Sequence, residues 1–234
     1  MQLSQYVSTQ ENTFQFSREQ ASRFAKNIAD DFNPIHDIDA KRFCVPGDLL
    51  FTVALSQLGL QQKMHIRFAD MVTDGIELHF AATETNGQEI QDTNGKTFLA
   101  VDASGERSQD LERNMKLAEQ YVAFSGKTFP HVLVPLWKDK NVMVNPARPL
   151  VIYESMSLDV DSLDFQTPTV ELCGSSFEVN GKRGNVALQF EFKDGERVFG
   201  SGEKRMVLSG LKPYEQTAID GLIEFYDQRK IDLA

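Results

Sequence analysis

The hexapeptide DFNPIH, residues 31–36, places a carboxylate and an imidazole in one proline-containing segment. Histidine has the unperturbed pKa nearest neutrality, so His36 can accept or release a proton at physiological pH. The Asp31 carboxylate can orient this imidazole or share its water, while Asn33 and Pro34 can hold the loop in shape. The segment therefore predicts acid–base chemistry on a small molecule. On spacing alone, the competing interpretation is a helix-terminating turn with a solvent-exposed His36.

A capped amphipathic helix must precede this loop. Ser17 and Gln20 have the spacing of a capping box, in which each side chain bonds to the backbone N–H of the other residue. Phe24 and Ile28 follow on one apolar stripe. The helix is expected to end before Pro34, because the residue that precedes a proline is driven out of the α region.

A second helix, predicted over Asp48–Leu60, is apolar on almost every side and carries no charge after Asp48 until Lys63. A helix that is apolar all round is a buried helix. Its start at Gly47 presents unpaired N–H donors and a partial positive charge, which favour a negatively charged group. The Asp48 carboxylate stabilises the helix dipole but would repel a developing anion if it faced the same pocket.

Alternating apolar and polar residues predict antiparallel strands after this helix and again in the second half of the chain. The predicted strands are Met64–Ala69, Ile76–Thr85, Thr97–Ala103, Leu150–Val160, Thr169–Val179, Asn185–Phe192 and Val198–Leu208, with Asn-Gly or Asp-Gly turns such as Asn86-Gly87 between some of them. An amphipathic helix that carries Leu111 and Val122 separates the two groups, and Pro213 is expected to open a final helix.

The order of a helix followed by antiparallel strands thus occurs twice. It predicts an α+β fold with two halves, residues 1–107 and 108–234, and a boundary in the polar run Ser104–Asp110. Two antiparallel sheets that each wrap a helix, followed by a C-terminal helix, are typical of a double hot-dog fold. Another α+β sandwich would give a similar pattern.

Composition and cysteine usage exclude several classes of protein. The 234 residues carry a formal net charge of −10, which argues against nucleic-acid and anionic-membrane partners. Cys44 and Cys173 form no C-x-x-C motif, and His36, His65 and His79 do not have metal-ligand spacing, so we expect neither a disulfide framework nor a metal site. Without a visible secretory signal or an apolar run of about 20 residues, the sequence predicts a cytoplasmic protein.

The order of three segments resembles the MaoC-like (R)-specific enoyl-CoA hydratases and dehydratases. These segments are Phe16-Ser17…Ala21…Phe24-Ala25, the hexapeptide at 31–36, and Val45-Pro46-Gly47. The resemblance is strongest over residues 16–60, and the second half lacks the hexapeptide, which resembles a double hot-dog in which one half keeps a site. The whole chain also resembles an uncharacterised bacterial family of similar length.

The resemblance implies that Asp31 and His36 are catalytic, while Asn33 and Pro34 position the loop. The pair would hold the water that is added to a 2-enoyl thioester or removed from a (R)-3-hydroxyacyl thioester in fatty acid metabolism. The N–H of Gly47 would receive the thioester oxygen. Coenzyme A or an acyl carrier would be part of the substrate, with no separate cofactor.

Two alternatives stay open. A non-catalytic hot-dog protein that binds an acyl thioester or another small ligand is favoured by Asp48, and by Leu55 at the place where the family often has a hydroxyl side chain. A thioesterase is the third interpretation. Because hot-dog sheets leave a free edge, either the two halves pair with each other or two chains form a homodimer.

Overall fold

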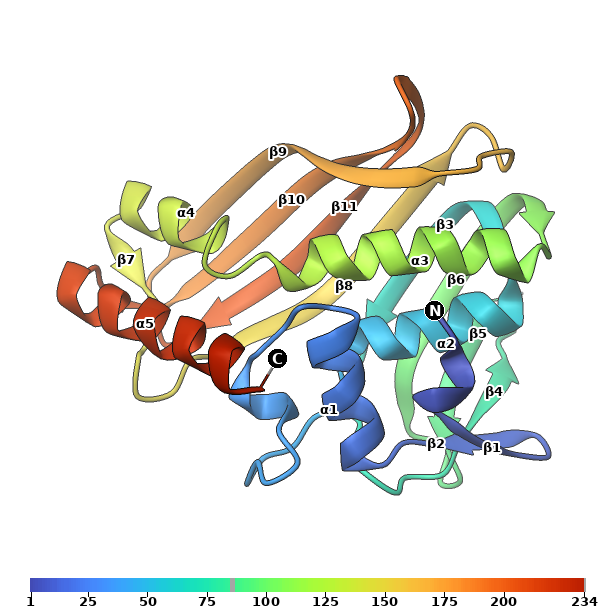
Figure 1. Ribbon diagram of the computed structural model, residues 1–234, viewed down its shortest axis with the longest axis horizontal. Coiled ribbons are helices and arrows are strands. Elements are labelled where there is room, and N and C mark those ends of the chain that lie inside the picture. The colour runs from blue at the N-terminus through green and yellow to red at the C-terminus, as the bar shows by residue number, and fades with distance from the viewer. Residues whose placement is uncertain (85–86, 234) are drawn as a thin grey trace.

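A ten-stranded antiparallel sheet dominates the computed structural model, which describes residues 1–84 and 87–233 (Figure 1). In sheet order its strands are β1 (Ser8–Gln10), β2 (Thr13–Gln15), β4 (Leu78–Ala82), β5 (Gln88–Asp92), β6 (Thr97–Ser108), β3 (Leu60–Phe68), β8 (Val151–Val160), β11 (Arg197–Ser209), β10 (Arg183–Asp194) and β9 (Pro168–Asn180). A small second sheet pairs β12 (Lys212–Pro213) with β7 (Val142–Met143).

The α-helices lie on one side of the large sheet (Figure 1). They are α1 (Arg18–Asn27), α2 (Gly47–Leu58), α3 (Leu111–Gly126), α4 (Leu133–Asp139) and α5 (Gln216–Leu233), with 3-10 turns η1 (Leu3–Gln5) and η2 (Pro34–His36). The expected mixture of helices with antiparallel strands and the expected C-terminal helix are therefore present. Among the described residues, no helix is both long and apolar enough to cross a membrane.

The two halves of the large sheet have the same strand order. After α2 the strands β3 to β6 are arranged β4-β5-β6-β3, and after α3 the strands β8 to β11 are arranged β9-β10-β11-β8. The two sets join where β3 pairs antiparallel with β8, with Ile66 opposite Met156. Each half thus covers a sheet edge of the other, so one continuous sheet stands where the sequence predicted two.

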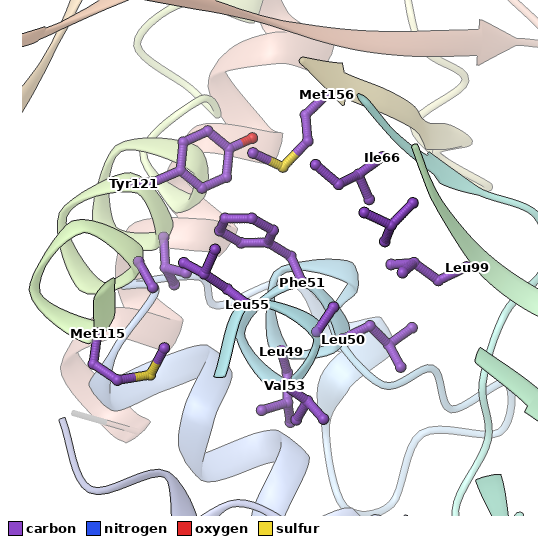
Figure 2. Packing of buried hydrophobic residues seen from close by; sticks show 14 of the residues in the cluster. Leu49, Leu50, Phe51, Val53, Leu55, Ile66, Leu99, Met115, Tyr121 and Met156 are labelled. Atoms are coloured by element: carbon purple, nitrogen blue, oxygen red, sulfur yellow. The ribbon is translucent and has the colours of Figure 1, made fainter. Parts of the chain in front are cut away.

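The core lies between this sheet and the helices α2 and α3. Leu49, Phe51 and Leu55 of α2 are fully buried. Figure 2 shows Phe51 between Tyr121 of α3 and the side chains of the sheet, and the two rings meet edge to face with centroids 5.3 Å apart. Burying one large apolar side chain contributes about 1.5–3 kcal/mol to the free energy of folding. Because α2 has no polar face, it buries several such side chains and forms the centre of the core. Met156 contacts this core from β8.

Local signals at the helix ends match the structure. The Oγ of Ser17 accepts a hydrogen bond from the Gln20 N–H at 3.2 Å, while the Ser17 N–H donates to Oε1 of Gln20 at 2.9 Å. The second helix ends at Leu58, two residues earlier than predicted, because Gly59 has φ of +76° and turns the chain into β3.

Three predicted elements begin or end elsewhere in the structure, and part of one lies outside the described residues. The strand predicted to end at Ala103 continues to Ser108 as β6, where Ser108 lies opposite Leu60 in a pairing that local composition does not reveal. Pro213 pairs with Val142 in the small sheet, so the last helix starts later, at Gln216. The predicted strand 76–85 is shorter, at 78–82, while its last residue and the asparagine of the predicted 86–87 turn lie outside the described residues.

We expect Phe51→Ala to lower the free energy of unfolding by about 3–5 kcal/mol, because it leaves a cavity between α2, α3 and the sheet. Urea titration followed by circular dichroism measures this loss. Phe225→Ala is the matched control, because Phe225 is 53% exposed and should change stability by less than about 0.5 kcal/mol. Equal effects of the two substitutions would contradict the central position of Phe51.

Candidate functional site

The hexapeptide forms a compact loop after α1. Asp30 adopts a φ of +54°, which turns the chain after the helix. The N–H of Asn33 donates to Oδ1 of Asp31 at 2.9 Å, and Oδ1 of Asn33 accepts from the Ile35 N–H at 3.2 Å. Pro34 occupies the first turn of η2, where its missing N–H is not needed. These interactions fix the loop through its own side chains.

The loop brings Asp31 and His36 together. Nε2 of His36 lies 3.6 Å from Oδ2 of Asp31, and the two side chains are 12% and 27% exposed, so His36 does not extend into bulk solvent. Nδ1 of His36 lies 2.6 Å from the carbonyl oxygen of Cys44. A carbonyl only accepts, so Nδ1 is the donor, and in this tautomer the lone pair of the ring is on Nε2, toward the carboxylate.

The same contact ties the loop to the segment that leads into α2. The Cys44 N–H also donates to the Ile35 carbonyl at 3.0 Å. In the first turn of α2, Leu49 N–H bonds to the Pro46 carbonyl, whereas the described residues provide no hydrogen-bond acceptor for the N–H groups of Gly47 and Asp48. Two donors at the positive end of the helix dipole are therefore unpaired.

Aromatic rings cover the start of α2. A Cβ on Gly47 would lie 3.0 Å from Cε1 of Phe68 and 3.3 Å from Cδ1 of Tyr153, and the centroids of these two rings are 4.2 Å apart. Glycine at this position permits the close approach of both rings. The structure thus joins Asp31 to His36, while Gly47 lies beneath Phe68 and Tyr153.

A buried polar cluster at the start of α2 escaped the sequence analysis as a unit. Oδ2 of Asp48 accepts a hydrogen bond from Oγ of Ser125 at 2.6 Å, and Nζ of Lys204 donates to the same Oγ at 2.6 Å. All three residues are buried. Burial raises the pKa of Asp48, against the opposing effects of Lys204 and Ser125, and burial lowers the pKa of Lys204.

A sequence signal for two members of this cluster existed. Ser125 continues the apolar stripe of α3 that includes Ala118 and Tyr121. Lys204 lies opposite Met156 in β8 and Leu188 in β10, both buried, so it occupies an inward position of the sheet. Each is a polar residue where the periodicity predicts an apolar one.

The C-terminal helix α5 holds the loop from outside. The Tyr226 hydroxyl accepts from the Phe32 N–H at 3.1 Å and donates to the Asp30 carbonyl at 3.3 Å. Nε of Arg229 donates to the Phe32 carbonyl at 2.8 Å, and its guanidinium pairs with Asp37. Sequence reasoning placed a helix here but gave it no role, because these contacts join residues far apart in the chain.

The Cys44 thiol and the His65 imidazole have surroundings that differ from those of Asp31 and His36. Burial raises the pKa of the Cys44 thiol to about 12, so it stays protonated and is a poor nucleophile. A polar groove that includes Lys63 and His65 lies over β6, β3, β8 and β11, where the exposed side chains of the strands point to solvent. Within residues 1–84 and 87–233, no group of three or more His, Cys, Asp or Glu side chains is arranged to hold a metal ion.

The chain belongs to the family described as "Protein of unknown function (DUF3581)", whose sequence profile matches residues 1–217. The match ends at the start of α5, so most of that helix lies outside it. The comparison with curated proteins finds no match.

Several solved structures have a similar arrangement of elements. A conserved protein of unknown function with hot dog fold from Alicyclobacillus acidocaldarius has 8% identity, covers 92% of this chain and 99% of its own, and has a TM-score of 0.49. A MaoC-like dehydratase has 11% identity, coverages of 87% and 98%, and a TM-score of 0.44. The acyl-CoA thioesterase II TesB2 from Mycobacterium marinum has 9% identity, coverages of 92% and 100%, and a TM-score of 0.44. Likeness at this level carries no argument about activity.

We expect Tyr226→Phe to destabilise the protein by about 1–3 kcal/mol, because the buried Phe32 N–H loses its acceptor. Thermal or urea unfolding measures the loss. Tyr214→Phe is the matched control, because the Tyr214 hydroxyl bonds to Gln216 at an exposed position. If both substitutions leave stability unchanged, the hydroxyl of Tyr226 does not hold the loop.

Asp48→Asn should change how stability depends on pH. An unfolded aspartate has a pKa of about 3.9, and the folded value is higher because Asp48 is buried. The native state therefore retains a proton that the unfolded state releases, so wild-type stability falls as pH rises from about 4 through the raised pKa. The variant cannot bind this proton, so its free energy of unfolding should rise relative to that of the wild type as the pH increases over this range. Urea unfolding from about pH 4 to pH 8 tests this, and parallel pH curves would contradict it.

Proposed function

We propose that this member of the DUF3581 family is a double hot-dog hydratase or dehydratase that acts on a 2-enoyl or (R)-3-hydroxyacyl thioester of coenzyme A or an acyl carrier. The observation that carries the proposal is the half-buried pair in which Nε2 of His36 faces Oδ2 of Asp31 at 3.6 Å. Nδ1 of the same ring is held by the Cys44 carbonyl. The motif order around residues 16–60 supports the same reaction.

The 3.6 Å between Nε2 of His36 and Oδ2 of Asp31 is longer than a direct hydrogen bond, but one water molecule beside the pair can contact both atoms. During hydration, Nε2 of His36 takes a proton from this water while its oxygen bonds to C3 of the enoyl chain. The C2–C3 π electrons move toward the thioester carbonyl, and C2 then takes the proton from the imidazolium. Asp31 orients the water and stabilises the imidazolium. Dehydration is the reverse sequence.

The unpaired N–H groups at the start of α2 would receive the thioester oxygen as it gains negative charge. Donors fixed in advance at a helix N-terminus stabilise such an oxyanion by several kcal/mol in other enzymes. The rings of Phe68 and Tyr153 lie over Gly47, so the substrate must displace one of them. Both rings are partly buried, but the Tyr153 hydroxyl bonds to the Tyr121 hydroxyl, whereas Phe68 at the end of β3 is apolar. Rotation of Phe68 would open the helix start.

A binding protein without catalysis is the second candidate. The aromatic cover over Gly47 and the Asp48 carboxylate beside it favour this reading, because both oppose an enolate at the helix start. In that case the acyl thioester or another small ligand binds and is released unchanged.

We further propose that the two halves, residues 1–107 and 108–234, are hot-dog units of which only the first keeps the acid–base loop. Their identical strand order supports this division. The outer strands β1 and β9 leave edges at which two chains could form a homodimer. The free thiols of Cys44 and Cys173 support a reducing, cytoplasmic location.

We expect Asp31→Asn and His36→Ala each to lower the hydration rate of crotonyl-CoA at least about 100-fold, because each removes one half of the acid–base pair. Loss of the enoyl-thioester absorbance measures the rate, and circular dichroism checks folding. His65→Ala is the matched control, because His65 is an exposed histidine of β3.

Near wild-type hydration by both variants would refute the roles of Asp31 and His36. A wild type that binds acyl-CoA but hydrates no enoyl chain length would establish the binding protein instead. Isothermal titration with saturated acyl-CoA separates binding from turnover.

A further inference from the structure

One oxygen of the buried cluster has no partner. Asp48 is only 9% exposed, and its Oδ1 is buried. This oxygen accepts no hydrogen bond from the described residues. The other oxygen bonds to Ser125, whose hydroxyl is also the acceptor for Lys204. The carboxylate is therefore fixed on one side and unfilled on the other.

Stability does not account for this arrangement. An unpaired buried polar atom costs about 1–3 kcal/mol, and apolar side chains of similar volume often replace a buried ion pair without loss. An aspartate that served only the helix dipole could do so at an exposed position without desolvation. Asp48 instead lies inside the protein with a lysine from β11 as its countercharge. Such a group is suited to a ligand that supplies the missing donor.

The unfilled oxygen belongs to the same region as the acid–base pair. Asp48 directly follows Gly47 at the start of α2, and the segment that leads into this helix includes Cys44, whose carbonyl oxygen lies 2.6 Å from Nδ1 of His36. A substrate that reaches Asp31 and His36 with its thioester oxygen at the start of α2 would therefore pass Asp48.

The surroundings restrict what that chain can be. Aromatic rings pack between α2, α3 and the sheet, and Figure 2 shows the ring of Tyr121 next to that of Phe51. The centroid of the Tyr121 ring lies 5.3 Å from those of both Phe51 and Phe190. The Tyr121 hydroxyl bonds to the Tyr153 hydroxyl, and Nζ of Lys204 lies 4.4 Å from the centre of the Tyr153 ring. Because these rings fill the region and carry hydroxyl groups among them, we expect it to admit a short chain with a polar end and not a long alkyl chain.

Charge selects the kind of donor. Lys204 already supplies a cation beside Asp48, so an ammonium group on the ligand would add a second positive charge to a buried site. A neutral hydroxyl group donates one hydrogen bond without that cost.

We propose that Oδ1 of Asp48 accepts a hydrogen bond from a hydroxyl group on a short acyl chain, beyond the carbons that react, so that the preferred ligands are short hydroxylated acyl thioesters. The proposal rests on the proposed function for the thioester carrier and for the position of the reacting carbons. Lys204, held through Ser125, balances the charge of the carboxylate.

The test is a set of binding measurements on saturated thioesters, which cannot be hydrated. Isothermal titration of the full chain compares 4-hydroxybutyryl-CoA, butyryl-CoA and decanoyl-CoA. We expect the wild type to bind the hydroxylated chain at least about 10-fold more tightly than butyryl-CoA, since a hydrogen bond to a charged group has at least this value, and to bind decanoyl-CoA most weakly.

The variant Asp48→Leu should erase the preference for the hydroxyl while it changes butyryl-CoA binding less than about twofold. Asp48→Asn keeps a side chain of the same shape and serves if the leucine variant does not fold, with an expected partial loss of preference. Asp102→Asn, at an exposed position of β6, is the matched control and should behave as wild type. Thermal unfolding verifies that each variant is folded.

The outcomes separate the two proposals. Equal binding of the two four-carbon thioesters, a preference that survives in both Asp48 variants, or tightest binding of decanoyl-CoA would overturn the role of Asp48. Crotonyl-CoA hydration without any hydroxyl preference would leave the hydratase proposal standing alone. A hydroxyl preference lost in the Asp48 variants, without hydration, would support the role of Asp48 and reject the hydratase. Binding of none of the three thioesters would reject both.

Discussion

Enclosure of α2 is the constraint on which the rest of the structure depends. The helix is apolar on nearly every side, so any face left in water would cost the burial energy of side chains such as Leu49, Phe51 and Leu55. A sheet covers only one side of a helix, and α3 and the N-terminal segments must cover the others (Figure 1). Enclosure also takes the first turn of the helix out of water, so the unpaired N–H groups of Gly47 and Asp48 end up inside the molecule. The candidate site is a consequence of burying a helix together with its polar end.

The second half of the chain contributes two of the polar side chains at the buried start of α2. Asp48 comes from the first half, whereas Ser125 and Lys204, which bond to each other beside it, come from α3 and β11. The strand order of the two halves is the same, but their polar residues differ, because the hexapeptide lies in the first half and the buried Lys204 in the second. Neither half contains the whole arrangement. Joining the halves through β3 and β8 therefore does more than cover two sheet edges, because it also brings Ser125 and Lys204 to the start of α2.

Features set by local sequence were predictable, and features set by distant contacts were not. The capping box at Ser17, the buried helix and the strands of the second half follow from short-range periodicity, and the structure has them. The continuous sheet depends on the pairing of β3 with β8, about which neither strand carries a local signal. The contacts of Tyr226 and Arg229 with the hexapeptide loop are equally remote in sequence. Within the site, the proximity of Asp31 to His36 was predictable from the loop. The position of Lys204 near Asp48 was not, because it depends on the pairing of β11 with β8 and β10 and on the packing of α3.

The contacts of the loop indicate which part of the site can move. His36 is bonded to the Cys44 carbonyl, and the backbone around Phe32 is held from α5, so rearranging the loop would break several buried hydrogen bonds at once. Phe68 is held differently, because its half-buried ring covers Gly47 mainly through packing against Tyr153. A ring held by packing can rotate at lower cost than a hydrogen-bonded loop can unfold. The start of α2 is thus covered by a ring that packing holds, whereas Asp31 and His36 lie in a loop that hydrogen bonds hold.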